Sequence, residues 1–287
     1  PYGMPSDSLF IGKIGAHKVA FMPRHGRSHT ILPHLINYRA NVWAMKEAGC
    51  KRVISPCAAG SLQKHVAPGH FVICDQFVDW TDGRKTTFFE GPIVTHPSAA
   101  ETYCPELRKL AIDTAKELGI TVHETGTVVV INGPRFSTKA ESKFFTSQGW
   151  EVINMTAFPE AYLVKEMDMC PLNISLITDY DAGLVGDVPP VSHHEVIQVF
   201  NSNLDNLKKL LFTIRVKLLS CKERLNMLSY IADKIFYFYY LLIIVRIFLS
   251  WIPNTDWNAQ PFNWLRSITD PFLNIFRGII PPIGMLD

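Results

Sequence analysis

Two aspartates follow a buried strand near the middle of the chain, in the stretch SLITDYDAG at residues 175–183. The run Ile174–Ile177 is mostly apolar, which is typical of a strand covered on both faces. Asp179 and Asp181 come directly after it, on either side of Tyr180. A carboxyl group acts as an acid near neutral pH only where burial or a neighbouring carboxylate raises its pKa. The pair is therefore a candidate for acid chemistry, provided that a binding site lies at the end of this strand.

A basic loop and a turn of small residues, each after a predicted strand, could bind an anion. Arg24 and His25 lie in PRHGRSH and could donate charge-assisted hydrogen bonds. Cys57 and Ala58 lie in SPCAAGSL, whose backbone amides could hold a phosphate because small side chains allow close approach. Both stretches also have an ordinary interpretation, since exposed basic loops are usually only solvated and such turns usually only redirect the chain.

Three further residues at strand and helix ends could contact a nucleoside-like ligand. Phe136, at the entry to a predicted helix, could stack on a planar base or pack in the core. Met155 could lie against the apolar face of a sugar or fill the core. Thr156 could donate to a phosphate or a sugar hydroxyl, or could cap the next helix.

The elements that must position these residues alternate between strands and helices up to about residue 218. Runs rich in β-branched residues predict strands at 18–26, 52–60, 70–78, 127–136, 151–156 and 172–181, and amphipathic patterns predict helices at 35–49, 104–119, 139–149 and 159–167. This order favours an α/β sheet with helices on both faces. Ligands of such sheets bind beyond the carboxyl ends of strands, where Asp179 and Asp181 are expected.

Composition excludes some classes of function. The net charge of +2 argues against a protein that binds nucleic acid mainly through phosphate neutralisation. The six cysteines lack CxxC spacing and predict reduced thiols in a cytoplasmic compartment. The stretch Ser192–Glu195 includes two histidines, but a capping box formed by Ser192 and Glu195 explains it without a metal.

The chain changes character at about residue 218, so we predict one domain at 1–217 and a different segment at 218–287. Residues 235–252 are almost wholly apolar and, with Tyr230–Ala232 before them, approach the length of a transmembrane helix. Basic residues before them predict that the preceding domain stays cytoplasmic, tethered to a membrane by residues 230–252. Arg246 lies inside the run, where a charge is expensive. The alternative is a buried helix of a soluble protein.

Five motifs of the first domain occur in the order that a known enzyme family shows. PRHGR, CAAGSL, GPRFSTKAE, NMTAFPEA and TDYDAG together resemble the 5'-methylthioadenosine phosphorylase family, within the trimeric purine nucleoside phosphorylase superfamily, over residues 1–216. The resemblance implies a mixed sheet flanked by helices and cleavage of a nucleoside by inorganic phosphate. The products would be adenine and 5-methylthioribose 1-phosphate, in methionine and purine salvage. Phosphate is a co-substrate, and no metal or organic cofactor is implied.

The resemblance also implies a role for each candidate residue. Asp179 matches the acid at purine N7 and Asp181 the residue that binds the 6-amino group, a pairing that favours a 6-aminopurine. The family's phosphate-binding positions are occupied here by Arg24, His25, Cys57, Ala58 and Thr156. The family often has threonine where this sequence has Cys57. Phe136 matches the residue against the base, Met155 the one under the ribose, and His96 a residue that a neighbouring subunit lends to the 5' pocket, which makes a homotrimer the expected assembly.

Both ends of the sequence depart from these families. The phosphorylases open with a strand and a glycine-rich turn that supplies a phosphate ligand, and this sequence starts after that point, so we expect both to be absent from it. Residues 229–287 resemble the YggT family of small membrane proteins, with its second hydrophobic span absent. Three alternatives stay open: a phosphorylase for other purine nucleosides, an inactive phosphorylase-like half fused to a membrane-assembly protein, and a nucleoside sensor without turnover.

Overall fold

The computed structural model describes residues 1–14, 17–182, 193–250, 256 and 258–277. Contacts divide the chain into two compact units, Pro1–Ile214 and Arg215–Asp287. The first unit carries the sheet and the candidate site residues, and the second carries most of the apolar tail. Each is described by itself.

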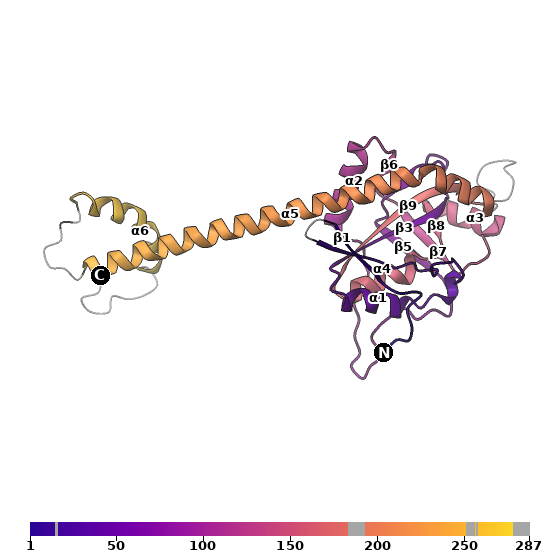
Figure 1. Cartoon of the computed structure of the whole chain (residues 1–287), viewed down its shortest axis with the longest axis horizontal. Coiled ribbons are helices and arrows are strands. Elements are labelled where there is room, and N and C mark those ends of the chain that lie inside the picture. Colours follow the sequence, from indigo (N-terminus) through magenta and orange to yellow (C-terminus); the bar gives the residue numbers. More distant parts are fainter. Residues whose placement is uncertain (15–16, 183–192, 251–255, 257, 278–287) are drawn as a thin grey trace. The chain divides into compact units, whose positions relative to one another are not determined.

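A seven-stranded mixed sheet forms the centre of the first unit (Figure 1). Its strand order is β5 (Gln76–Trp80), β7 (Thr127–Ile131), β8 (Val152–Asn154), β3 (Arg52–Ser61), β9 (Cys170–Tyr180), β4 (Phe71–Val72) and β6 (Val122–His123). β3 and β9 run parallel over ten paired positions, while β8 is antiparallel to β3 and β4 is antiparallel to β9. The strands expected at 52–60, 127–136, 151–156 and 172–181 are therefore confirmed in substance.

The expected helices are present and flank this sheet. They are α1 (Tyr38–Glu47), α2 (Pro105–Glu117), α3 (Lys139–Ser147) and α4 (Ala157–Glu166), with a short 3-10 helix, η1 (Pro33–Leu35), before α1. α4 packs on β9 and on α1, whereas α2 packs on β6 and β9. Figure 1 shows α1 and α4 on one side of the sheet and α2 with the first turns of α5 (His193–Ser250) on the other. The mixed α/β fold predicted from the sequence is confirmed.

Two strand predictions were wrong in detail. The run expected as one strand at 70–78 bends after Val72, so that its first part pairs with β9 and its second with β7. Gly126 lies at the matching bend between β6 and β7, where a Cβ atom would approach Val72 Cγ1 to 2.6 Å. The run expected at 18–26 gives β2 (His17–Phe21), which pairs with β1 (Phe10–Ile14) in a separate hairpin instead of joining the main sheet.

The second unit is described over the later part of α5 and over α6 (Phe262–Arg277). Residues 230–250 of the expected span are helical, as part of α5. Among the described residues, no helix combines the length and the apolarity that crossing a bilayer requires. Ser192, the first residue of the capping box expected with Glu195, lies outside the described residues, but Thr138 and Glu141 form a capping box at the start of α3.

Candidate functional site

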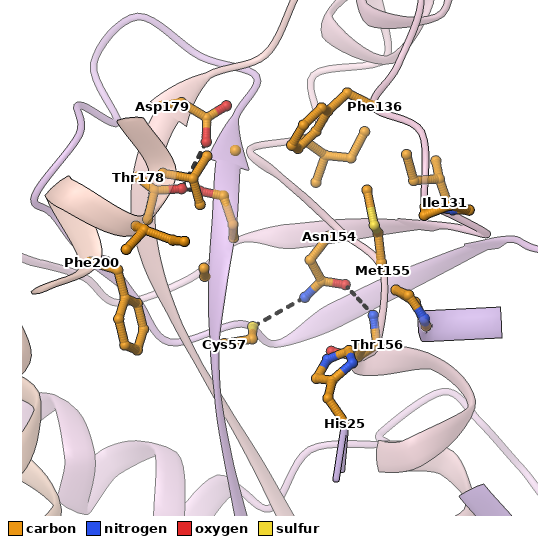
Figure 2. Close-up of a pocket in the computed structure, with 18 of the residues that line it drawn as sticks. His25, Cys57, Ile131, Phe136, Asn154, Met155, Thr156, Thr178, Asp179 and Phe200 are labelled. Atoms are coloured by element: carbon orange, nitrogen blue, oxygen red, sulfur yellow. Dashed lines mark hydrogen bonds between the residues drawn. The ribbon is translucent and has the colours of Figure 1, made fainter. Parts of the chain in front are cut away.

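A pocket of about 880 Å³ opens at the end of the central strands of the first unit. Its wall comes from β3, β8 and β9, from the loops after β2 and β7, and from the first turns of α5. A volume of this size is typical of small-molecule sites. Nine of the ten residues predicted as site residues line it: Arg24, His25, Cys57, Ala58, Phe136, Met155, Thr156, Asp179 and Asp181. Figure 2 shows Asp179 and Phe136 toward one end of the pocket, and His25 and Thr156 toward the other.

An irregularity in the β3–β9 ladder places the two aspartates. Ala59 pairs with Ile177, but Gly60 pairs with Asp179, so Thr178 is an extra residue in β9. A β-bulge of this kind bends the strand and redirects the side chains after it. Gly60 makes room for the result, because a Cβ atom there would lie 3.2 Å from Asp179 Oδ2 and 2.9 Å from Ile153 Cγ2.

The hydroxyl of Thr178 can serve Asp179 in either protonation state. Thr178 Oγ1 lies 2.7 Å from Asp179 Oδ1 and 3.3 Å from the carbonyl oxygen of Ala59. The hydroxyl donates to Oδ1 when the carboxyl is ionised. If Oδ1 carries a proton, the hydroxyl can accept it as a hydrogen bond and donate its own proton to Ala59. Sequence reasoning missed Thr178, although it directly precedes the first aspartate.

Asp181 is the more deeply buried acid. Asp181 is only 4% exposed. Its backbone amide donates to the carbonyl oxygen of Ser61 at 2.9 Å. Burial raises the pKa of Asp181, and the hydroxyls of Ser142 and Ser137 oppose that shift. Oδ2 has no hydrogen-bond partner among the described residues. A buried acceptor without a hydrogen bond destabilises a protein by about 1–3 kcal/mol. A ligand that donates an N–H hydrogen bond to this oxygen would therefore bind more tightly.

Arg24 is held by a buried carboxylate at the other end of the pocket. Its Nε and Nη2 donate to the two oxygens of Glu160 at 2.9 and 2.8 Å, and its Nη1 donates to the carbonyl oxygen of Pro56 at 3.0 Å. Burial opposes the charge on Arg24, but Glu160 more than offsets this, and the pKa of Arg24 rises above its usual value. A guanidinium has five N–H donors, so one on each Nη stays available to an anion.

His25 is fixed in one tautomer. Its Nδ1 lies 2.8 Å from the carbonyl oxygen of Ile31, which can only accept, so Nδ1 carries a proton. The ring stacks on His29 with centroids 4.5 Å apart. Burial lowers the pKa of His25, while the hydrogen bond to Ile31 opposes that shift. A proton at Nδ1 leaves Nε2 as the atom of a neutral ring that can accept a hydrogen bond.

Asn154 links two of the predicted phosphate residues and was missed by sequence reasoning. Its Nδ2 donates to Cys57 Sγ at 3.2 Å, and its Oδ1 accepts from the backbone amide of Thr156 at 3.4 Å (Figure 2). Asn173 and Ser175 also lie within hydrogen-bond distance of the Cys57 sulfur. Cys57 thus belongs to a buried polar network under the pocket.

Of the three remaining predicted residues, Phe136 and Met155 line the pocket and His96 does not. Phe136 is 39% exposed in the pocket wall. Met155 packs closely on Gly133, where a Cβ atom would come within 2.6 Å of Met155 Sδ. His96 is exposed in the loop between β5 and α2 and does not line the pocket. Among the residues with a described structure, no cluster of three histidine, cysteine or acidic side chains could hold a metal.

Two family models match the chain. The sequence model of the phosphorylase superfamily matches residues 1–214, and that of the CCB3/YggT family matches residues 225–287. The S-methyl-5'-thioadenosine phosphorylase of Thermofilum pendens is 52% identical over 211 residues, which cover 74% of this chain and 79% of that protein. The enzyme of the same name from Saccharolobus solfataricus is 51% identical over 219 residues, or 76% and 80% of the two chains.

A relative with another name and a solved structure extend this comparison. The purine nucleoside phosphorylase of Streptomyces coelicolor is 45% identical over 232 residues, covering 78% of this chain and 82% of that protein. The methylthioadenosine phosphorylase of Schistosoma mansoni in complex with adenine superposes with a TM-score of 0.73 at 33% identity, over 76% of this chain and 83% of that one. The phosphorylase-superfamily match at residues 1–214 includes all the residues that line the pocket.

Proposed function

The chain belongs to the phosphorylase superfamily through residues 1–214, and on that premise we propose that it cleaves 5'-methylthioadenosine with inorganic phosphate. The products are adenine and 5-methylthioribose 1-phosphate, so the chain is a pentosyltransferase of nucleoside salvage. No metal or organic cofactor takes part in this reaction, in which phosphate is the second substrate. Relatives named for this substrate, which are 52% and 51% identical to the chain, support the choice of 5'-methylthioadenosine as substrate.

The observation that carries the proposal is the set of side chains that line one pocket. Two carboxyl groups lie in its wall together with an arginine, a histidine and a threonine suited to an anion. Phosphorolysis needs both kinds of group at once, because the nucleophile is an anion and the leaving purine takes up negative charge. We assign Arg24, His25, Thr156 and the turn at Cys57 and Ala58 to phosphate; Nε2 of neutral His25 would accept a hydrogen bond from the hydroxyl of monohydrogen phosphate.

The reaction exchanges one bond at the anomeric carbon of the sugar for another. A phosphate oxygen forms a bond to this carbon while the bond from the carbon to purine N9 breaks, and its electron pair moves into the purine. A proton or a strengthening hydrogen bond from Asp179 to N7 relieves the charge that develops there. Holding phosphate and nucleoside in line supplies much of the remaining rate enhancement.

Asp181 accounts for the choice of base. Its buried Oδ2 lacks a partner among the described residues and can accept a hydrogen bond from the 6-amino group of adenine. A 6-oxopurine would present an oxygen to this acceptor. We place Phe136 against the base and Met155 under the ribose, as both lie in the pocket wall. A phosphorylase for other purine nucleosides is the second candidate, favoured by the relative from Streptomyces coelicolor.

Adenine release by the purified full chain tests the proposal. We expect release from 5'-methylthioadenosine that requires phosphate and that exceeds hypoxanthine release from inosine, because Asp181 faces an amino group in the first case only. Release that is unaffected by omitting phosphate would contradict phosphorolysis and favour hydrolysis. Faster cleavage of inosine would favour the second candidate.

We also propose an assembly for the chain. The phosphorylase domain spans 1–217 and forms a homotrimer in which His96 reaches the 5' pocket of a neighbouring subunit; the exposure of His96 leaves it available for such a contact.

Residues 218–287 tether the domain to the cytoplasmic face of a membrane through residues 230–252, as the CCB3/YggT match supports. After alkaline carbonate extraction the chain should stay in the membrane pellet, and sedimentation in detergent should give three copies. Recovery in the supernatant would contradict the tether, and a monomer would contradict the trimer.

A further inference from the structure

Arg84 makes six hydrogen bonds immediately behind the pocket wall, although it does not line the pocket itself. It lies in the loop after β5. Nη2 donates toward the carbonyl oxygens of Met155 at 2.9 Å, Asn132 at 3.1 Å and Ile131 at 3.3 Å. Nη1 donates to the carbonyl oxygen of Phe158 and toward the hydroxyl of Tyr38, and Nε donates to Asn132 Oδ1 at 3.3 Å. One side chain therefore ties together segments that are distant in the sequence.

The segments that Arg84 joins form the pocket wall. Ile131 and Met155 line the pocket at the ends of β7 and β8, and Thr156 follows Met155 directly. Tyr38 in turn donates to the carbonyl oxygen of Pro33, another residue of the wall, at 2.9 Å. The guanidinium thus holds the end of β7 beside the end of β8, where the proposed sugar contact Met155 and phosphate contact Thr156 lie.

Arg84 differs from Arg24 in having no carboxylate among its hydrogen-bond partners in the described structure. Glu160 neutralises Arg24, whereas all six partners of Arg84 are carbonyl, amide or hydroxyl oxygens. Burial lowers the pKa of Arg84 but leaves a guanidinium charged at neutral pH. Only the planar fork of arginine presents donors in several fixed directions, so lysine is not an equivalent replacement.

We infer that Arg84 is a positioning residue of the phosphorylase site, which holds the ends of β7 and β8 so that phosphate and nucleoside meet in line. This inference rests on the proposed function. A displacement of about 1 Å in a reacting group can lower a rate by about a hundredfold. Loss of Arg84 should therefore raise the KM for phosphate and lower kcat, beyond any loss of folded protein.

The test compares three variants of the full chain in the adenine-release assay. Arg84→Met and Arg84→Lys should each raise the KM for phosphate by about tenfold or more, since neither replacement bridges the carbonyl oxygens. Arg39→Met is the matched control, because Arg39 donates to the carbonyl oxygen of Thr87 and to Glu90 in the same loop, and in the described structure it has no hydrogen bond to these wall segments. We expect its KM for phosphate to equal that of the wild type. Added guanidinium ion, at millimolar and non-denaturing concentration, should partly restore kcat of Arg84→Met.

The outcomes separate the possible failures. KM does not depend on the amount of active protein, so a purely structural role for Arg84 would lower yield and melting temperature while leaving KM for phosphate unchanged. That result, or an equal rise in Arg39→Met, overturns the inference. If Arg84→Met does not fold, an unchanged KM for phosphate in Arg84→Lys overturns it equally. A wild type without phosphate-dependent adenine release would instead reject the proposed function.

Discussion

Replacing Asp179 by asparagine is expected to lower kcat for adenine release by about 10²–10⁴-fold, the usual contribution of a general acid. Asparagine keeps the size of the side chain and can still form a hydrogen bond, but it cannot deliver a proton to purine N7. The KM for phosphate should change little, because the anion contacts lie toward the other end of the pocket. Steady-state kinetics with both substrates varied measures the two effects separately.

Asp168→Asn is the matched control for this variant. Asp168 is exposed and has a φ of 53°, a conformation that asparagine also tolerates. Its kcat should equal that of the wild type. If Asp179→Asn retained more than about a tenth of the wild-type kcat, proton donation by Asp179 could not be a main source of catalysis. The bulge at Thr178 would then be a feature of the sheet without a catalytic purpose.

Replacing Arg24 by methionine is expected to abolish phosphate binding and to destabilise the fold. Glu160 is only 4% exposed, so removal of Arg24 leaves a buried carboxylate without its cation. Breaking a buried ion pair in this way typically costs about 3–5 kcal/mol. Denaturant unfolding measures the loss of stability, and the KM for phosphate measures the loss of the ligand.

A double variant separates these two effects. Replacing both Arg24 and Glu160 by methionine removes the uncompensated charge and should recover most of the stability, but not the binding of phosphate. Arg135→Met is the control, because Arg135 and Glu141 form an exposed pair whose loss should change stability far less than the loss of the buried pair. Restored phosphate binding in the double variant would contradict the assignment of Arg24 to phosphate.

Periodicity in the sequence predicted most of the main sheet and the four flanking helices α1 to α4. The long apolar runs of β3 and β9 are strong signals because both faces of these strands are buried. The run at 70–78 was misinterpreted, since periodicity does not show that a strand changes its neighbours at a bend. The bend depends on Gly126, some fifty residues away in the sequence, which lets the two strands approach closely.

Residues in the pocket wall could be predicted more easily than residues behind it. The wall residues occur in short motifs at strand ends, where residues that are neighbours in the sequence also lie close together in the site. Glu160 and Arg84 lie behind the wall, and Asn154 lies in it. All three act through other side chains or backbone groups, and their partners are distant in the sequence. Glu160 was quoted within a motif, but nothing in the motif indicates that its carboxylate meets Arg24. Which of the two aspartates is more deeply buried could not be inferred either, because a bulge decides it.

The fate of the phosphate tests the central claim most directly. The full chain is incubated with 5'-methylthioadenosine and phosphate in water enriched in heavy oxygen, and the sugar product is identified by mass spectrometry. Phosphorolysis predicts 5-methylthioribose 1-phosphate without heavy oxygen from the solvent, in an amount equal to the adenine released. Free 5-methylthioribose in an amount equal to the adenine released, with no sugar phosphate formed, would show that water, not phosphate, attacks the sugar, and would contradict the account.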